Sequence, residues 1–69
     1  MPRVIWNRPG NPSDYVSGRL GIARWQLRVA IHKIKNGADI QPDELVIIYD
    51  DGSVRDANGE PIGNIYDEI

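Results

Sequence analysis

Residues 23–36 have the sequence ARWQLRVAIHKIKN, and this stretch decides the fold. Its apolar side chains recur at the spacing of a helix that buries one face: Ala23, Leu27, Ala30, Ile31 and Ile34. Two lysines fall in the last turn, where they favour the negative end of the helix dipole, and a glycine follows at position 37. The sequence therefore predicts a long amphipathic helix from Ala23 to Asn36.

A shorter helix is predicted just before it, over residues 12–20. Asn11 is the expected N-cap, and Pro12 suits the first helical position because its missing N–H has no partner there. Val16 and Leu20, four residues apart, give this helix an apolar stripe, and a glycine at position 21 is typical of a helix end.

The segments outside the helices have the patterns of extended chain. Arg3–Trp6 is compatible with a short strand, whereas two prolines and a glycine make residues 7–12 an extended arm. Residues 38–44 connect the long helix to a run of β-branched residues, Leu45–Tyr49. Tight turns at 51–52 and 58–59 then separate two further short strands, 53–56 and 61–66.

These elements predict an α+β fold. Two helices, the second long and amphipathic, are followed by a three-stranded antiparallel β-meander, which a short N-terminal strand can join. We expect one small domain, 1–69, with an extended arm or strand at 1–12, a helical hairpin at 12–36 and the meander at 44–67. A core this small rarely contributes more than ~3–5 kcal/mol, so the sequence leaves homodimerisation open.

Composition narrows the functional classes. The chain has no cysteine, which excludes disulfides and thiolate zinc sites. The absence of cysteine also fits a cytoplasmic protein. The longest apolar run, residues 45–48, is far too short to span a membrane, so no membrane partner is expected. The acidic turns lack the ligand spacing of calcium loops, and no glycine-rich phosphate loop is present. We therefore expect neither a metal nor a cofactor.

Charge is divided between the two halves of the chain. Residues 1–36 carry seven Lys or Arg and one acid, a net +6, whereas residues 37–69 carry nine acids and one arginine, a net −8. Such a division indicates either an anionic partner for the basic half, most simply nucleic acid, or electrostatic pairing of the two halves within the fold.

The basic residues of the long helix form the candidate binding surface. At 100° per residue, Arg24, Arg28 and Lys35 fall on one flank, with Trp25 and His32 just beside them. Cations and an aromatic ring on a rigid helix are what a phosphate backbone and an unstacked base require. The alternatives are an ordinary solvated face, or cations neutralised by the acidic half.

His32 is the only histidine and is the natural candidate for proton transfer near neutral pH. Lys35 lies three residues on, on the same side of the helix, so His32 and Lys35 are the candidate catalytic pair for metal-free RNA cleavage. The alternative is a structural histidine, because the same helix offers neither a second histidine nor a carboxylate to complete an acid–base pair.

Ser13–Lys35 resembles a helix-turn-helix. Ser17 is small where the two helices would touch, and a glycine falls in the turn. The resemblance implies that Arg24, Trp25, Arg28 and Val29 face the major groove of DNA. Ala23 departs from the pattern, because a serine or threonine cap is more typical there, and the acidic turns of the following hairpin would repel phosphates.

A second resemblance covers residues 18–69. It rests on five strings: LGI (20–22), AIHKIK (30–35), PDELVI (42–47), DGSV (51–54) and GEPIGNIYD (59–67). They resemble the C-terminal segment of bacterial polymorphic toxins, the interchangeable tips of contact-dependent and Rhs-type systems, some with a ribonuclease fold of helices followed by a meander. The resemblance implies RNA as substrate, with His32 and Lys35 as site residues.

The sequence thus predicts a small nucleic-acid-contacting domain that favours RNA over DNA. Two alternatives stay open beside a toxin-type ribonuclease core. One is the helix-turn-helix DNA module. The other is a non-catalytic interaction module whose acidic sheet, with Asp50 and Asp51 at a turn, binds a basic protein.

Overall fold

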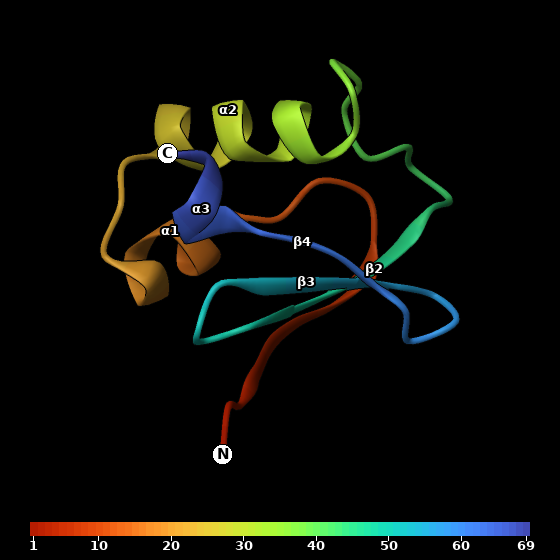
Figure 1. The fold of residues 1–69 in the computed structure, drawn as a ribbon, viewed down its shortest axis with the longest axis horizontal. Helices are drawn as coiled ribbons and strands as arrows, with labels where there is room; N and C mark the ends of the chain where they lie inside the picture. The colour runs from red at the N-terminus through yellow and green to blue at the C-terminus, as the bar shows by residue number, and fades with distance from the viewer.

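The computed structural model describes all 69 residues and shows an antiparallel sheet with helices against one face (Figure 1). In chain order the elements are β1 (Val4–Pro9), α1 (Asp14–Leu20), α2 (Arg24–Ile34), β2 (Leu45–Tyr49), β3 (Ser53–Asp56), β4 (Pro61–Asn64) and α3 (Ile65–Glu68). The predicted α+β class is confirmed. The sheet has four strands because the N-terminal segment joins the meander, and α3 is a helix in addition to the two predicted.

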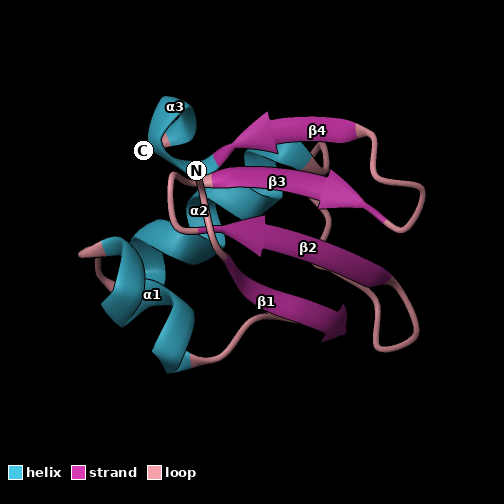
Figure 2. Ribbon diagram, turned by 90° about the horizontal axis from the view of Figure 1, so that it is seen from below, coloured by secondary structure: helices cyan, strands magenta, loops and turns pink.

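The four strands lie side by side in chain order, each antiparallel to the next (Figure 2). One row of paired residues crosses the sheet, from Trp6 to Ile48, then Val54, then Gly63. The side chains of Trp6, Ile48 and Val54 are buried, because this row lies on the face of the sheet that the helices cover. This row is part of the sheet surface against which α2 packs.

The core joins all three helices to the sheet. Its buried apolar residues are Trp6, Val16, Leu20, Leu27, Ala30, Ile31, Ile40, Val46, Ile48, Val54 and Ile65. The predicted apolar stripes of α1 and α2 therefore face the core, with Ile34 only partly buried. Ala23 is exposed because it lies outside α2, as its N-cap.

The sheet face away from the helices is only partly covered. Burial alternates along β2, so Leu45, Ile47 and Tyr49 lie on this open face and remain half-buried. The guanidinium of Arg55 stands over the Tyr49 ring at 5.7 Å from its centroid, which shields part of the face from solvent.

The N-terminal boundaries differ from the prediction for a reason that the sequence does not show. The cap of α1 is Ser13 rather than Asn11. The Asn11 side chain instead accepts a hydrogen bond from the Ile40 amide at 3.1 Å, and so ties the arm to the segment after α2. β1 continues to Pro9, opposite Leu45, because an edge strand tolerates a proline.

The C-terminal end turns from strand to helix sooner than predicted. β4 stops at Asn64, whose side chain accepts from the Tyr66 amide at 2.9 Å and so caps α3. The Tyr66 hydroxyl donates to the Leu20 carbonyl at 2.6 Å. The last helix is thereby fastened to the end of α1.

Gly63 sets how closely α2 approaches the sheet. A Cβ at this position would lie 2.7 Å from Cγ1 of Ile34, nearer than real Cβ atoms pack. Gly63→Ala should therefore destabilise the fold by about 1–3 kcal/mol through overpacking, measured by urea unfolding. Gly18→Ala is the matched control: Gly18 lies in α1 with open space around it, and this change should stabilise by about 0.5–1 kcal/mol. Equal stability of the two variants would contradict the packing argument.

Tyr66→Phe tests the tie between α3 and α1. It removes only the hydroxyl that donates to Leu20, so we expect a loss of about 1 kcal/mol in the free energy of unfolding. Tyr15→Phe removes the hydroxyl of a tyrosine that is 60% exposed, and it should leave the urea midpoint unchanged. A Tyr66→Phe midpoint equal to that of the wild type would show that the bond contributes nothing.

Candidate functional site

A groove runs along α2 beside the arm that precedes α1. Its volume is about 470 Å³. Its lining consists of residues 11–14, Arg24, Trp25, Leu27, Arg28, Ile31 and Asp39. We call this depression the α2 groove. Leu27 and Ile31 are buried, whereas the other α2 residues in the lining are exposed, so the groove has an apolar base and a charged rim.

Both rim arginines are paired with carboxylates, but the pairs are open to solvent. Arg24 Nε lies 2.6 Å from Asp14 Oδ1, and the two side chains are 79% and 70% exposed. Arg28 Nη2 lies 3.7 Å from Asp39 Oδ2. Exposed ion pairs contribute only about 0.2–1 kcal/mol, so either guanidinium can exchange its carboxylate for a phosphate.

Trp25 stands on the same rim and is 67% exposed. The other tryptophan, Trp6, is buried in the core, with the Arg8 guanidinium over its ring at 4.9 Å. Packing within the fold therefore accounts for Trp6 but not for Trp25. An exposed indole beside two arginines offers an aromatic surface on which a base or another planar group can stack.

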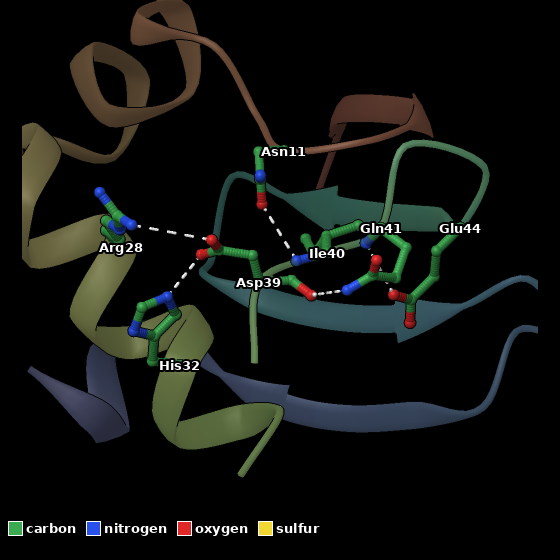
Figure 3. A network of polar contacts seen from close by, with 7 residues as sticks. All are labelled: Asn11, Arg28, His32, Asp39, Ile40, Gln41 and Glu44. Carbon is green, nitrogen blue, oxygen red and sulfur yellow. Dashed lines mark hydrogen bonds and ion pairs between the residues drawn. The ribbon is translucent and has the colours of Figure 1, made fainter. Parts of the chain in front are cut away.

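His32 has a carboxylate partner from outside its helix. Its Nε2 lies 2.5 Å from Asp39 Oδ1, and its side chain is 34% exposed (Figure 3). Asp39 belongs to the connector, residues 35–44 between α2 and β2. An ionised carboxylate can only accept, so Nε2 carries the hydrogen, and Nδ1 is left on the side of the ring away from Asp39.

A left-handed turn brings this carboxylate back to the helix. α2 ends at Ile34 rather than Asn36, and Asn36 and Gly37 have φ of 58° and 92°. The Gly37 amide donates to the His32 carbonyl, which reverses the chain. Asn11 then holds the backbone amide next to Asp39, as Figure 3 shows. The carboxylate is thus positioned by hydrogen bonds that the backbone donates on both sides of it, from Gly37 to the His32 carbonyl and from Ile40 to the Asn11 side chain.

Lys35 does not join His32. It bonds instead to the Glu44 carboxylate, and both side chains are largely covered. The structure therefore separates the predicted catalytic pair into two ion pairs, His32 with Asp39 and Lys35 with Glu44. It also divides the predicted basic surface, because Arg24, Trp25 and Arg28 line the α2 groove and Lys35 does not.

Two carboxylates of the hairpins accept hydrogen bonds within their own turns. Asp51 accepts from the Ser53 hydroxyl and amide, which lowers the pKa of that carboxyl, and Asp56 accepts from the amides of Asn58 and Glu60. Asp50 accepts from the Arg3 amide. The carboxylates that pair with α2 come from α1 and the connector, so the two charged halves neutralise each other only in part.

Sequence reasoning missed Asp39. It sought a partner for His32 only on the same helix, where helical spacing brings residues together. The usable signal was the Asn36–Gly37 pair, which predicts a left-handed turn after the helix, followed two residues later by an acid.

No group of three or more His, Asp or Glu side chains is arranged to hold a metal ion. The longest helix, α2, has 11 residues, and no helix has the length and apolar character to cross a bilayer.

Comparison of the chain with protein-family models, with curated proteins and with solved structures gives no match. The arrangement around α2 is therefore interpreted from its own geometry.

The Lys35–Glu44 pair should appear in the pH dependence of stability. Its hydrogen bond, with a further one from the Gln41 amide, lowers the pKa of the Glu44 carboxyl below 4.5. The stabilisation is therefore complete above pH 4.5 and is lost as the pH falls through the lowered value. Glu44→Gln should cost about 1 kcal/mol at pH 7 and nothing at the acid end, measured by urea unfolding against pH.

Glu60→Gln is the control for this pH series. The Glu60 side chain is exposed and makes no hydrogen bond, so its variant should follow the wild-type curve throughout. Identical pH curves for Glu44→Gln and Glu60→Gln would mean that the Lys35 pair contributes no stability.

Proposed function

We propose that this protein binds single-stranded RNA along the α2 groove. The observation that carries the proposal is the 67% exposure of Trp25 beside the rim arginines Arg24 and Arg28. A single strand presents unstacked bases and flexible phosphates. Stacking on an indole contributes about 1–3 kcal/mol per base, and arginines hold the phosphates on either side.

The carboxylates of the groove favour an unpaired base over a duplex backbone. Asp14 and Asp39 line the groove next to the rim arginines with which they pair, and a continuous double row of phosphates would meet both carboxylates. An unpaired base instead presents amino groups on its Watson–Crick edge, and carboxylates can accept hydrogen bonds from these groups. The toxin resemblance is what directs the proposal to RNA rather than single-stranded DNA.

A DNA-binding module is the second candidate, and one observation favours it. α1 and α2 are joined by only three residues, with Gly21 left-handed at φ 70°. The Gln26 side chain accepts from the Ala23 amide at 2.9 Å, which supplies part of the cap that alanine lacks. In this mode Arg24, Trp25 and Arg28 would enter the major groove of duplex DNA.

The test is a titration of the labelled chain with a 2′-O-methyl RNA single strand and with duplex DNA, at two salt concentrations, followed by backbone amide shifts. We expect the single strand to shift amides of α2 and of residues 11–14. Trp25→Ala should weaken binding by roughly tenfold or more. Arg24→Ala and Arg28→Ala should each reduce the salt slope by about 0.7, the value for one phosphate contact on a single strand.

Arg19→Ala is the matched control, because Arg19 is an exposed arginine of α1 that makes no ion pair and does not line the groove. Its affinity should stay within about twofold of the wild type. Preference for the duplex would transfer the assignment to the DNA module. Absence of binding to both, or an equal loss in Arg19→Ala, would reject the α2 groove as a nucleic-acid site.

A further inference from the structure

We propose that His32 and Asp39 form an acid–base dyad that cleaves RNA held on α2 by transfer to the ribose 2′-hydroxyl. In this assignment His32 is the catalytic residue, Asp39 is a positioning residue, and Arg28 stabilises the charge on the reacting phosphate. The inference rests on the proposed RNA binding and goes beyond it, because binding alone needs no proton transfer.

Spacing along the helix places the dyad in line with the binding surface. Arg24, Arg28 and His32 follow one another at four-residue intervals, so they lie on one stripe about 6 Å apart along the helix axis. Trp25 and His32 are seven residues apart, two turns on the same face, which separates them by about 10.5 Å. A strand whose base stacks on Trp25 and whose backbone follows α2 therefore passes Arg28 before it reaches His32.

Asp39 links the cation to the imidazole. One carboxylate oxygen lies 2.5 Å from His32 Nε2, and the other lies 3.7 Å from Arg28 Nη2. The arginine contact is the longer and more exposed of the two, so a phosphate can replace Asp39 at Arg28 while the bond to His32 remains. The phosphate then lies one helical turn from an oriented imidazole, with a guanidinium against its oxygens.

The orientation of the His32 ring suits a general base. With Nε2–H donated to Asp39, the neutral imidazole has its lone pair on Nδ1, and this atom has no hydrogen-bond partner in the protein. Figure 3 shows Nδ1 on the side of the ring opposite Asp39. The carboxylate fixes this tautomer and stabilises the imidazolium that forms when the ring accepts a proton.

The chemical step balances without a co-reactant. Nδ1 takes the proton of a ribose 2′-hydroxyl, the O2′–P bond forms and the P–O5′ bond breaks. The departing 5′ oxygen takes a proton from water, and the imidazolium returns its proton to the hydroxide left behind. The products are a 2′,3′-cyclic phosphate and a 5′-hydroxyl, and both dyad residues return to their starting state.

The experiment uses the full chain and a DNA oligonucleotide that contains one ribonucleotide, in the presence of a chelator. Binding is measured separately on the same sequence with a 2′-O-methyl group at that position, which cannot react. We expect cleavage at the ribonucleotide, with a cyclic phosphate end, and none in the all-DNA strand. His32→Ala should lower kcat by about 10²–10⁴-fold and leave binding of the unreactive strand unchanged.

Further variants separate chemistry from folding. His32→Gln keeps an N–H that can donate to Asp39 but cannot act as the base, so it should be as inactive as His32→Ala with the amide spectrum preserved. Added imidazole should restore part of the activity of His32→Ala. Asp39→Asn should lower kcat by about tenfold or more because it loosens the ring, and any change in KM that comes from its place in the groove lining should appear equally in the Kd for the unreactive strand.

Asp43→Asn is the matched control for Asp39→Asn. Asp43 is an exposed carboxylate of the same connector that makes no hydrogen bond or ion pair, so its variant should retain wild-type kcat.

The outcomes separate the two proposals. A chain that binds the unreactive strand but leaves the ribonucleotide intact overturns the dyad and leaves the binding function standing. Cleavage that survives His32→Gln overturns the assignment of His32 as the base, and cleavage that also occurs in the all-DNA strand overturns the 2′-hydroxyl route. A chain that fails to bind the unreactive strand and does not cleave rejects both proposals together.

Discussion

The close packing of α2 on the sheet is the constraint from which the rest of the structure follows. Ile34 occupies the space that a side chain at Gly63 would fill, and Leu27 and Ile31 are buried on the same side of the helix. With that side committed to the core, the remaining side of α2 must face solvent or a partner. The exposure of Trp25 and of the arginines beside it thus follows from the packing of the opposite side of α2 in the core.

Local sequence patterns predicted most of the elements, and long-range contacts set their limits. The stripe of α2 and the hairpin turns after β2 and β3 are visible in residues close together in the chain, so they were predicted correctly. The N-cap of α1 was wrong because Asn11 bonds to Ile40, 29 positions away. The length of β1 depended on pairing with β2, and α3 is held by the hydrogen bond from Tyr66 to Leu20, 46 positions away, neither of which helical or strand periodicity encodes.

The site was predicted in part for the same reason. Helical spacing correctly grouped Arg24, Trp25 and Arg28, since they share one element and line one groove. It placed Lys35 beside His32, whereas in the structure each of the two side chains bonds to a carboxylate of the connector once the chain reverses after α2. Long-range contacts also determine what becomes of the division of charge along the sequence. The cations of α2 pair with the acids nearest to them in space, while Asp51 and Asp56 accept hydrogen bonds within their own hairpin turns.

The two tryptophans occupy opposite environments, one under a guanidinium in the core and one open to water. Their emission should differ accordingly, with Trp6 responding to unfolding and Trp25 to whatever covers the helix. The chain therefore contains two intrinsic optical reporters at distinct positions. Occupancy of the surface and integrity of the core can be followed in one unlabelled sample.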